Sequence, residues 1–307
     1  MNFLLGVKSD PIEYRYSYEW LFALMRDHGI CRLQLGSFFE MYSLPDSYFY
    51  DLRALAERYN IRIKSVFTAH RELGGFFSGD ARLSAVAREN YERLIEVAAL
   101  LGAEYAGSNP GAVYRDRMKS KERGIACYLS NMKELTHKAK ELGLIGLSIE
   151  PMSCSAEPPA TPAEIDAMME ELTDYHSCHL DSTVPVYLCG DVSHGVADRD
   201  FHILYSNMEL FEWEIPWMCE FHIKNTDSHF SSTFGFSPSE RERGIVDVPS
   251  VLSTIYRRAG DWPVEEVVGY LEIGGPKLGR DYSDHLLGQQ LTESLEYISS
   301  FTKVVSL

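Results

Sequence analysis

Four successive apolar runs between residues 145 and 273 carry, at or near their ends, side chains that can bind a metal ion or move a proton: Glu150, Asp191, His222 and Glu272. If the three carboxylates met without a cation, they would repel one another and be forced to take up protons. A divalent cation removes that repulsion. One imidazole with three carboxylates suits Mn²⁺, Mg²⁺, Co²⁺ or Zn²⁺. The sequence therefore predicts a site for one divalent metal ion.

The runs that carry these residues belong to a repeating pattern of strands and helices. Eight short runs are expected as strands, and most are continuously apolar, which is typical of a parallel sheet buried on both faces. They cover residues 3–7, 32–35, 61–67, 104–107, 145–149, 184–189, 218–223 and 267–273. Apolar residues at helical spacing lie between them, for example Leu94, Val97, Ala98 and Leu101.

Eight strand–helix units favour one closed (β/α)₈ barrel, the TIM barrel, over an open doubly wound sheet. No Gly-x-Gly-x-x-Gly follows an early strand to support the open sheet. We therefore predict an α/β protein formed by a single TIM-barrel domain over residues 1–307. In such a barrel the carboxyl ends of all strands meet at one rim, where catalytic groups gather. The four candidate residues are expected at that rim.

Helix ends support this pattern at particular positions. Thr161 can cap a helix that Pro162 begins, and Glu164 is placed to complete a capping box. Gly102 and Gly143 each follow an apolar helical stretch and are expected to end it.

The ordered set Glu150-Pro151, Asp191-x-x-His194, His222 and Glu272, on this strand–helix pattern, resembles the xylose-isomerase-like barrels. That superfamily contains sugar and sugar-phosphate isomerases and epimerases. The pattern is most similar to the ketose 3-epimerases related to tagatose and allulose epimerases. The resemblance covers nearly the whole chain and is most specific between residues 145 and 275.

This resemblance implies roles for individual residues. Glu150, Asp191, His222 and Glu272 would bind the metal ion, and the two glutamates would also form the acid–base pair. His194 would hydrogen-bond a substrate hydroxyl or carbonyl. An ion that bridges the carbonyl and a neighbouring hydroxyl stabilises enolate charge, while one glutamate removes a proton and the other returns it from the opposite face. Return of the proton to the next carbon would give aldose–ketose isomerisation, so both reactions stay open.

The substrate's far end is where the sequence departs from the epimerase pattern. Those enzymes carry an arginine shortly after the strand-seven histidine, whereas here the first arginines after His222 are Arg241 and Arg243. Lys224 or Arg243 can take its place. Backbone donors together with Ser231, Ser232, Arg243 and Lys277 can hold a phosphate; the alternative is a solvated surface loop. We expect a short ketose or ketose phosphate, with a preference for the phosphate. His70, after the third strand, is a further candidate for contact with the sugar.

Composition limits the partners. Lys and Arg total 29 against 45 Asp and Glu, a formal charge of −16. Such a surface repels nucleic-acid phosphates and anionic lipids, and no apolar run reaches the roughly 18–20 residues of a membrane span. Six cysteines without paired spacing indicate a cytoplasmic protein. The expected partner is a small-molecule sugar or sugar phosphate, and the resemblance implies a homo-oligomer, either a dimer or a tetramer.

Three other functions stay open on the same residues. An inosose-type dehydratase or isomerase would use the same ligands on a cyclic polyol. A metal-dependent nuclease similar to abasic-site endonucleases is opposed by Ser108-Asn109-Pro110, where that family needs a histidine, and by the acidic charge. A barrel that only binds a sugar or a partner is opposed by the intact set of four candidate ligands.

Overall fold

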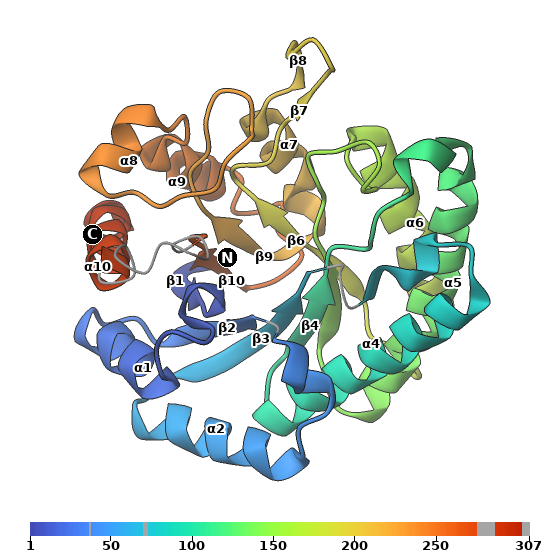
Figure 1. Ribbon diagram of the computed structural model, residues 1–307, viewed down its shortest axis with the longest axis horizontal. Helices are drawn as coiled ribbons and strands as arrows, with labels where there is room; N and C mark the ends of the chain where they lie inside the picture. The colour runs from blue at the N-terminus through green and yellow to red at the C-terminus, as the bar shows by residue number, and fades with distance from the viewer. Residues whose placement is uncertain (37, 70–72, 275–285, 303–307) are drawn as a thin grey trace. The chain divides into compact units, whose positions relative to one another are not determined.

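The computed structural model describes residues 1–36, 38–69, 73–274 and 286–302 (Figure 1). Eight parallel strands form a closed barrel in the order β1-β10-β9-β6-β5-β4-β3-β2. Their bounds are β1 (Asn2–Lys8), β2 (Arg32–Gly36), β3 (Arg62–Thr68), β4 (Tyr105–Ser108), β5 (Gly146–Ile149), β6 (Val186–Asp191), β9 (Met218–Ile223) and β10 (Glu266–Leu271). All eight predicted strands are confirmed, and so is the (β/α)₈ barrel.

Helices follow the strands along the chain and surround the barrel. Those described are α1 (Tyr18–Asp27), α2 (Asp46–Arg58), α4 (Ala81–Leu101), α5 (Lys121–Glu141), α6 (Pro162–Cys178), α7 (Asn207–Glu214), α8 (Pro238–Arg243), α9 (Val248–Arg257) and α10 (Leu287–Thr302). None of these described helices is both long and apolar enough to cross a membrane.

The chain forms two compact units. The first unit comprises residues 1–36, 54–62 and 190–307, and the second comprises residues 37–53 and 63–189. A single domain over residues 1–307 stays a prediction.

In the first unit, β1 and β10 lie side by side, and their register aligns Gly6 with Tyr270. Tyr270 is fully buried. A Cβ atom at Gly6 would lie only 2.6 Å from the Tyr270 ring, so this position needs glycine for the close approach. The pairing continues to Val7 and Leu271, and the next residues along the two strands, Lys8 and Glu272, therefore come out beside each other.

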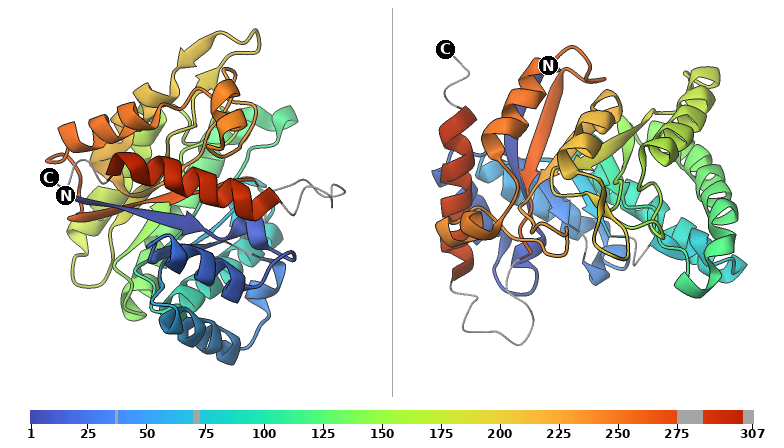
Figure 2. Two further views of the ribbon diagram at one scale, coloured as in Figure 1. Left: turned by 90° about the vertical axis from the view of Figure 1, so that its left-hand side faces the viewer. Right: turned by 90° about the horizontal axis from the view of Figure 1, so that it is seen from above.

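The last described helix, α10, packs against other parts of the first unit. Figure 1 and Figure 2 show α10 beside α9. A Cβ atom at Gly288 would lie 3.2 Å from the Trp20 ring of α1. On α10, Ser294 accepts a hydrogen bond from the backbone N–H of Phe236 at 2.8 Å. The helix thus anchors the segment between β9 and α8.

The helix ends agree with the sequence in most details. The Thr161 side chain accepts a hydrogen bond from the N–H of Glu164 and caps α6. Gly102 and Gly143 both have positive φ, at 70° and 81°. The predicted capping box is incomplete, since the Glu164 carboxylate accepts from the N–H of Ala160 and pairs with Lys121.

Candidate metal centre

Three of the four predicted ligands lie together within the first unit, because neighbouring parallel strands end at the same rim. Asp191 is the last residue of β6, His222 lies in β9 opposite Tyr270, and Glu272 directly follows β10. One candidate ligand atom of each lies within 4.8 Å of the others. The fourth predicted ligand, Glu150, follows β5 in the second unit and is 5% exposed.

Asp191 has one satisfied carboxylate oxygen and one that is not. Oδ1 accepts hydrogen bonds from the N–H and the hydroxyl of Ser193, at 2.8 and 2.7 Å. Oδ2 is buried and accepts no hydrogen bond with good geometry from any residue that the structure describes. Burying such an oxygen costs free energy unless a cation or donor faces it. The Lys224 ammonium lies 2.7 Å from Oδ2 and supplies positive charge there.

His222 is oriented from behind by Gln34. The imidazole Nε2 and the Gln34 side-chain oxygen are 2.8 Å apart, and both residues are fully buried. In a neutral ring this hydrogen bond places the proton on Nε2. The Nδ1 lone pair then faces Glu272 Oε2 at 3.4 Å and Asp191 Oδ2 at 3.8 Å. A second partner that fixes the ring in this way is typical of histidines that bind metal ions.

Glu272 is held by two lysines, one on each oxygen. Lys8 donates to Oε1 at 2.6 Å and Lys224 donates to Oε2 at 2.7 Å. Lys8 also pairs with Asp10 at 3.0 Å. Burial alone would raise the pKa of Glu272, but the positive charges of Lys224 and Lys8, together with that of His222 when its ring is protonated, outweigh burial and hold this pKa well below its usual value. Glu272 is therefore an ionised carboxylate.

This donor set fits a divalent cation. It offers carboxylate oxygens and an imidazole nitrogen, which suit Mn²⁺, Mg²⁺, Co²⁺ and Zn²⁺. Asp191 Oδ2 is the observation that tests the fit, because it is a buried anionic oxygen without a hydrogen bond from the described residues. A buried acidic and histidine cluster of this kind can bind a metal ion, as predicted; which metal it would bind stays open.

Two of the other predicted site residues, His194 and Lys224, lie beside this group. His194 Nε2 lies 3.5 Å from Asp191 Oδ2, and Lys224 lies within the group. Arg243 is stacked over the Phe234 ring, with its guanidinium carbon 4.0 Å from the ring centre. His70 and Lys277 lie outside the described residues.

Ser231 and Ser232 hold a carboxylate of the protein itself. Both hydroxyls donate to Asp227 Oδ2, with Ser231 at 2.6 Å. The backbone N–H groups of His229 and Ser231 donate to Oδ1. Two of the predicted phosphate donors, Ser231 and Ser232, are thus already paired with an anion.

Lys8 and Gln34 belong to the site and were not predicted from the sequence. Lys8 closes the apolar run of β1 as Asp191 closes that of β6, and this parallel was the available signal. Gln34 is a polar residue inside a short buried strand. A buried polar side chain carries a high desolvation cost, so a polar residue in a buried barrel strand is a candidate site residue.

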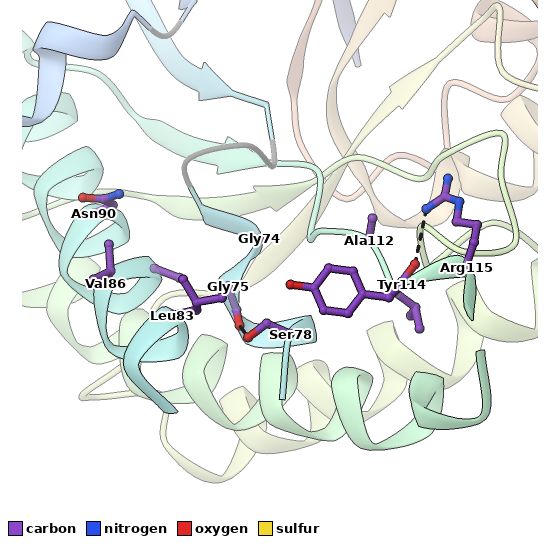
Figure 3. A pocket seen from close by; sticks show the side chains of 11 residues that line it. Gly74, Gly75, Ser78, Leu83, Val86, Asn90, Ala112, Tyr114 and Arg115 are labelled. Atoms are coloured by element: carbon purple, nitrogen blue, oxygen red, sulfur yellow. Dashed lines mark hydrogen bonds between the residues drawn. The ribbon is translucent and has the colours of Figure 1, made fainter. Parts of the chain in front are cut away.

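The second unit contains a separate pocket of about 490 Å³ (Figure 3). Figure 3 shows the Tyr114 ring directed towards Gly75 and Ser78. Arg115 is the charged residue of the lining, and its guanidinium is paired with Glu157 at 2.9 Å. This lining offers no carboxylate pair for proton transfer, so the metal centre is the stronger candidate for chemistry.

Solved structures similar to this protein share its fold. A putative xylose isomerase from Rhodospirillum rubrum has 19% identity and a TM-score of 0.79, covering 97% of this chain and 99% of its own. A D-psicose 3-epimerase determined with D-fructose has 16% identity and a TM-score of 0.68, covering 99% of both chains. The IOLI protein with a bound zinc atom has 16% identity and a TM-score of 0.68, covering 98% of this chain and 96% of its own.

No protein of curated function matches significantly. The sequence model of the xylose isomerase-like TIM barrel matches residues 23–266. This match confirms the resemblance inferred from the ordered strand-end residues. The protein is a member of the xylose isomerase-like TIM barrel family.

Proposed function

We propose that the protein is a metal-dependent isomerase or epimerase that acts on a short ketose. The observation that carries the proposal is the convergence of Asp191 Oδ2, His222 Nδ1 and Glu272 Oε2, three ligand atoms of the types that hold a catalytic divalent ion. Sugar epimerases and xylose isomerase-like proteins among the similar structures support this class of reaction.

Glu150 is the fourth ligand in this proposal. The register of β5 and β6 aligns Ile149 with Leu188, so Glu150 comes at the end of β5 as Asp191 comes at the end of β6. In a closed parallel barrel these strand ends face the same rim. Glu150 is nearly fully buried there, and a cation beside it would offset part of the cost of burying its carboxylate.

The proposed chemistry is proton transfer at the carbon beside a carbonyl. A bound divalent ion would act as a Lewis acid that stabilises enolate charge. Glu150 and Glu272 would exchange the substrate proton from opposite faces. His194, next to Asp191, would orient a substrate hydroxyl or carbonyl. Proton removal at C3 and return to the opposite face of C3 gives the epimer. Proton removal at C1 and return to C2, with the hydroxyl proton of C1 passing to the C2 oxygen, gives an aldose.

The far end of the substrate is proposed to be neutral. The sequence favours a phosphate, but the Ser231 and Ser232 hydroxyls already hold Asp227. A phosphate at those donors would meet the Asp227 carboxylate, and two anions repel each other. An unphosphorylated ketose needs only hydrogen bonds and fits this arrangement better. A homo-oligomeric state and a cytoplasmic location stay predictions.

The test is turnover in deuterium oxide. Chelator-treated protein is reloaded with Mn²⁺, Co²⁺, Zn²⁺ or Mg²⁺ and incubated with free short ketoses, the matched ketose phosphates and an inosose, and products are followed by NMR. We expect activity only with metal, a higher kcat/KM for the free ketose, and deuterium at the carbon whose configuration changes. Turnover of the inosose alone would replace the ketose assignment, and an epimer without solvent label would overturn the two-glutamate scheme.

Glu272→Gln is the matched variant for this test, with Glu265→Gln as its control. Glu265 is exposed just before β10 and lies on the same segment as Glu272. We expect Glu272→Gln to lose both metal occupancy and turnover, while Glu265→Gln keeps both. Equal metal content and turnover in the two variants would remove Glu272 from the site.

A further inference from the structure

The Lys224 ammonium contacts the two carboxylate oxygens that a metal ion would bind. Asp191 can offer only Oδ2, since Oδ1 is engaged by Ser193. On Glu272, Oε2 is the oxygen that faces the His222 Nδ1 atom, at 3.4 Å, whereas Oε1 accepts from Lys8. The Lys224 ammonium lies 2.7 Å from both of these remaining oxygens.

An ion and this ammonium would compete for the same lone pairs. Metal–oxygen bonds to carboxylates are about 2.0–2.2 Å for Zn²⁺ and Mg²⁺. A cation at that distance from both oxygens would be a close neighbour of an ammonium that keeps its contacts with the same two atoms. Two positive charges at short range in a buried site repel strongly, because the surroundings screen them poorly. Lys224 is only 7% exposed.

We propose that Lys224 is the internal cation of this site: its ammonium occupies the place of the divalent ion between Asp191 and Glu272, and ion binding displaces it. This inference rests on the proposed metal centre and adds to it. The lysine stabilises the assembled carboxylates in the metal-free protein and sets a weaker affinity for the ion than the ligands alone would give.

Lys8 makes a matched comparison because it carries the same charge on the other side of the same carboxylate. Its ammonium contacts Glu272 Oε1 and Asp10 Oδ2, neither of which is a candidate ligand atom in this arrangement. A general effect of removing positive charge would appear equally in Lys8→Met and Lys224→Met. Competition for the ligand oxygens would appear in Lys224→Met alone.

The experiment is calorimetric titration of Mn²⁺ and Co²⁺ into chelator-treated wild type, Lys224→Met and Lys8→Met, with the Co²⁺ absorption spectrum as a second readout. We expect Lys224→Met to bind the ion about tenfold more tightly or better, since a charge-assisted contact no longer has to be broken. Lys8→Met should gain clearly less. The metal-free Lys224→Met protein should melt at a lower temperature than wild type, and added ion should raise its melting temperature more.

Four outcomes decide the inference. A larger gain in Lys224→Met than in Lys8→Met supports it. Binding in Lys224→Met with none in wild type also supports it, while removing the metal dependence of the proposed function. Equal affinities in all three proteins, or equal gains in both variants, overturn it and leave the metal centre in place. No binding in any of them overturns both. If Lys224→Met does not fold, Lys224→Gln serves for the same measurements.

Discussion

Asp191 and Asp227 lie in the same unit and share one kind of local hydrogen bond, but the second oxygens of their carboxylates have different partners. In each, one carboxylate oxygen accepts from a backbone N–H two residues later, Ser193 for Asp191 and His229 for Asp227. Asp227 then receives serine hydroxyls on its other oxygen. The second oxygen of Asp191 receives no such hydrogen bond from the described residues and faces a lysine. A carboxylate whose two oxygens both accept hydrogen bonds builds a turn, whereas one whose second oxygen contacts an ammonium can bind another cation in its place.

The largest expected effect comes from removing Asp191 together with His222. The double variant Asp191→Ala, His222→Ala deletes two of the three ligands that meet in the first unit. Since a catalytic metal contributes several kcal/mol of transition-state stabilisation, we expect turnover to fall by about a thousandfold or more, and metal content after dialysis to fall to background. The measurements are kcat/KM on the active ketose and metal analysis of the purified protein.

A variant outside the group controls for nonspecific damage. Asp227→Asn changes an aspartate of the same unit and should keep its metal. Full metal occupancy in the double variant would show that the ion, if bound, lies elsewhere in the protein.

A second variant tests the support behind His222. Gln34→Leu keeps the volume of the side chain but removes the acceptor for Nε2–H, so the ring can turn and its proton can move to Nδ1. Partners of this kind usually change metal affinity by about 10- to 100-fold. We expect a loss in that range in a calorimetric titration, with the exposed Gln289→Leu of α10 as the matched control. Unchanged affinity would mean that packing alone orients His222.

Most of the barrel could be predicted from the sequence, since buried parallel strands read as continuous apolar runs. The hairpin formed by β7 (Val196–Ala197) and β8 (Ile203–Tyr205) escaped prediction. Its apolar residues Ile203 and Leu204 are exposed, so no burial pattern marks it. The backbone donor to the Glu164 carboxylate was predicted one residue from its actual position. Local capping rules consider only neighbouring residues and do not include Lys121, a partner 43 residues away.

The site was predictable in its residue types but not in its charge balance. The carboxylates and the histidine stand out because each ends an apolar run. Lys8 escapes because its partner Glu272 lies 264 residues away, and only closure of the barrel between β1 and β10 brings the two together. Similarly, Ser231 and Ser232 resemble anion donors in sequence, and only the structure shows that their anion is Asp227.

The smallest expected effect concerns Asp227, whose two carboxylate oxygens both accept hydrogen bonds. The hydroxyls of Ser231 and Ser232 hold the pKa of Asp227 well below its usual value, with help from the backbone N–H groups of Ser231 and His229. A lowered carboxyl pKa contributes stability that is fully present above the unfolded pKa of about 3.9 and is lost as the pH falls further. Asp227→Asn should therefore unfold more easily in urea at pH 7, by about 1 kcal/mol after allowing for solvent screening. This deficit should shrink at pH 3. A deficit that is the same at both pH values would trace to altered packing of the turn, and a loss of metal affinity in Asp227→Asn would contradict the separation of the two aspartates on which the comparison depends.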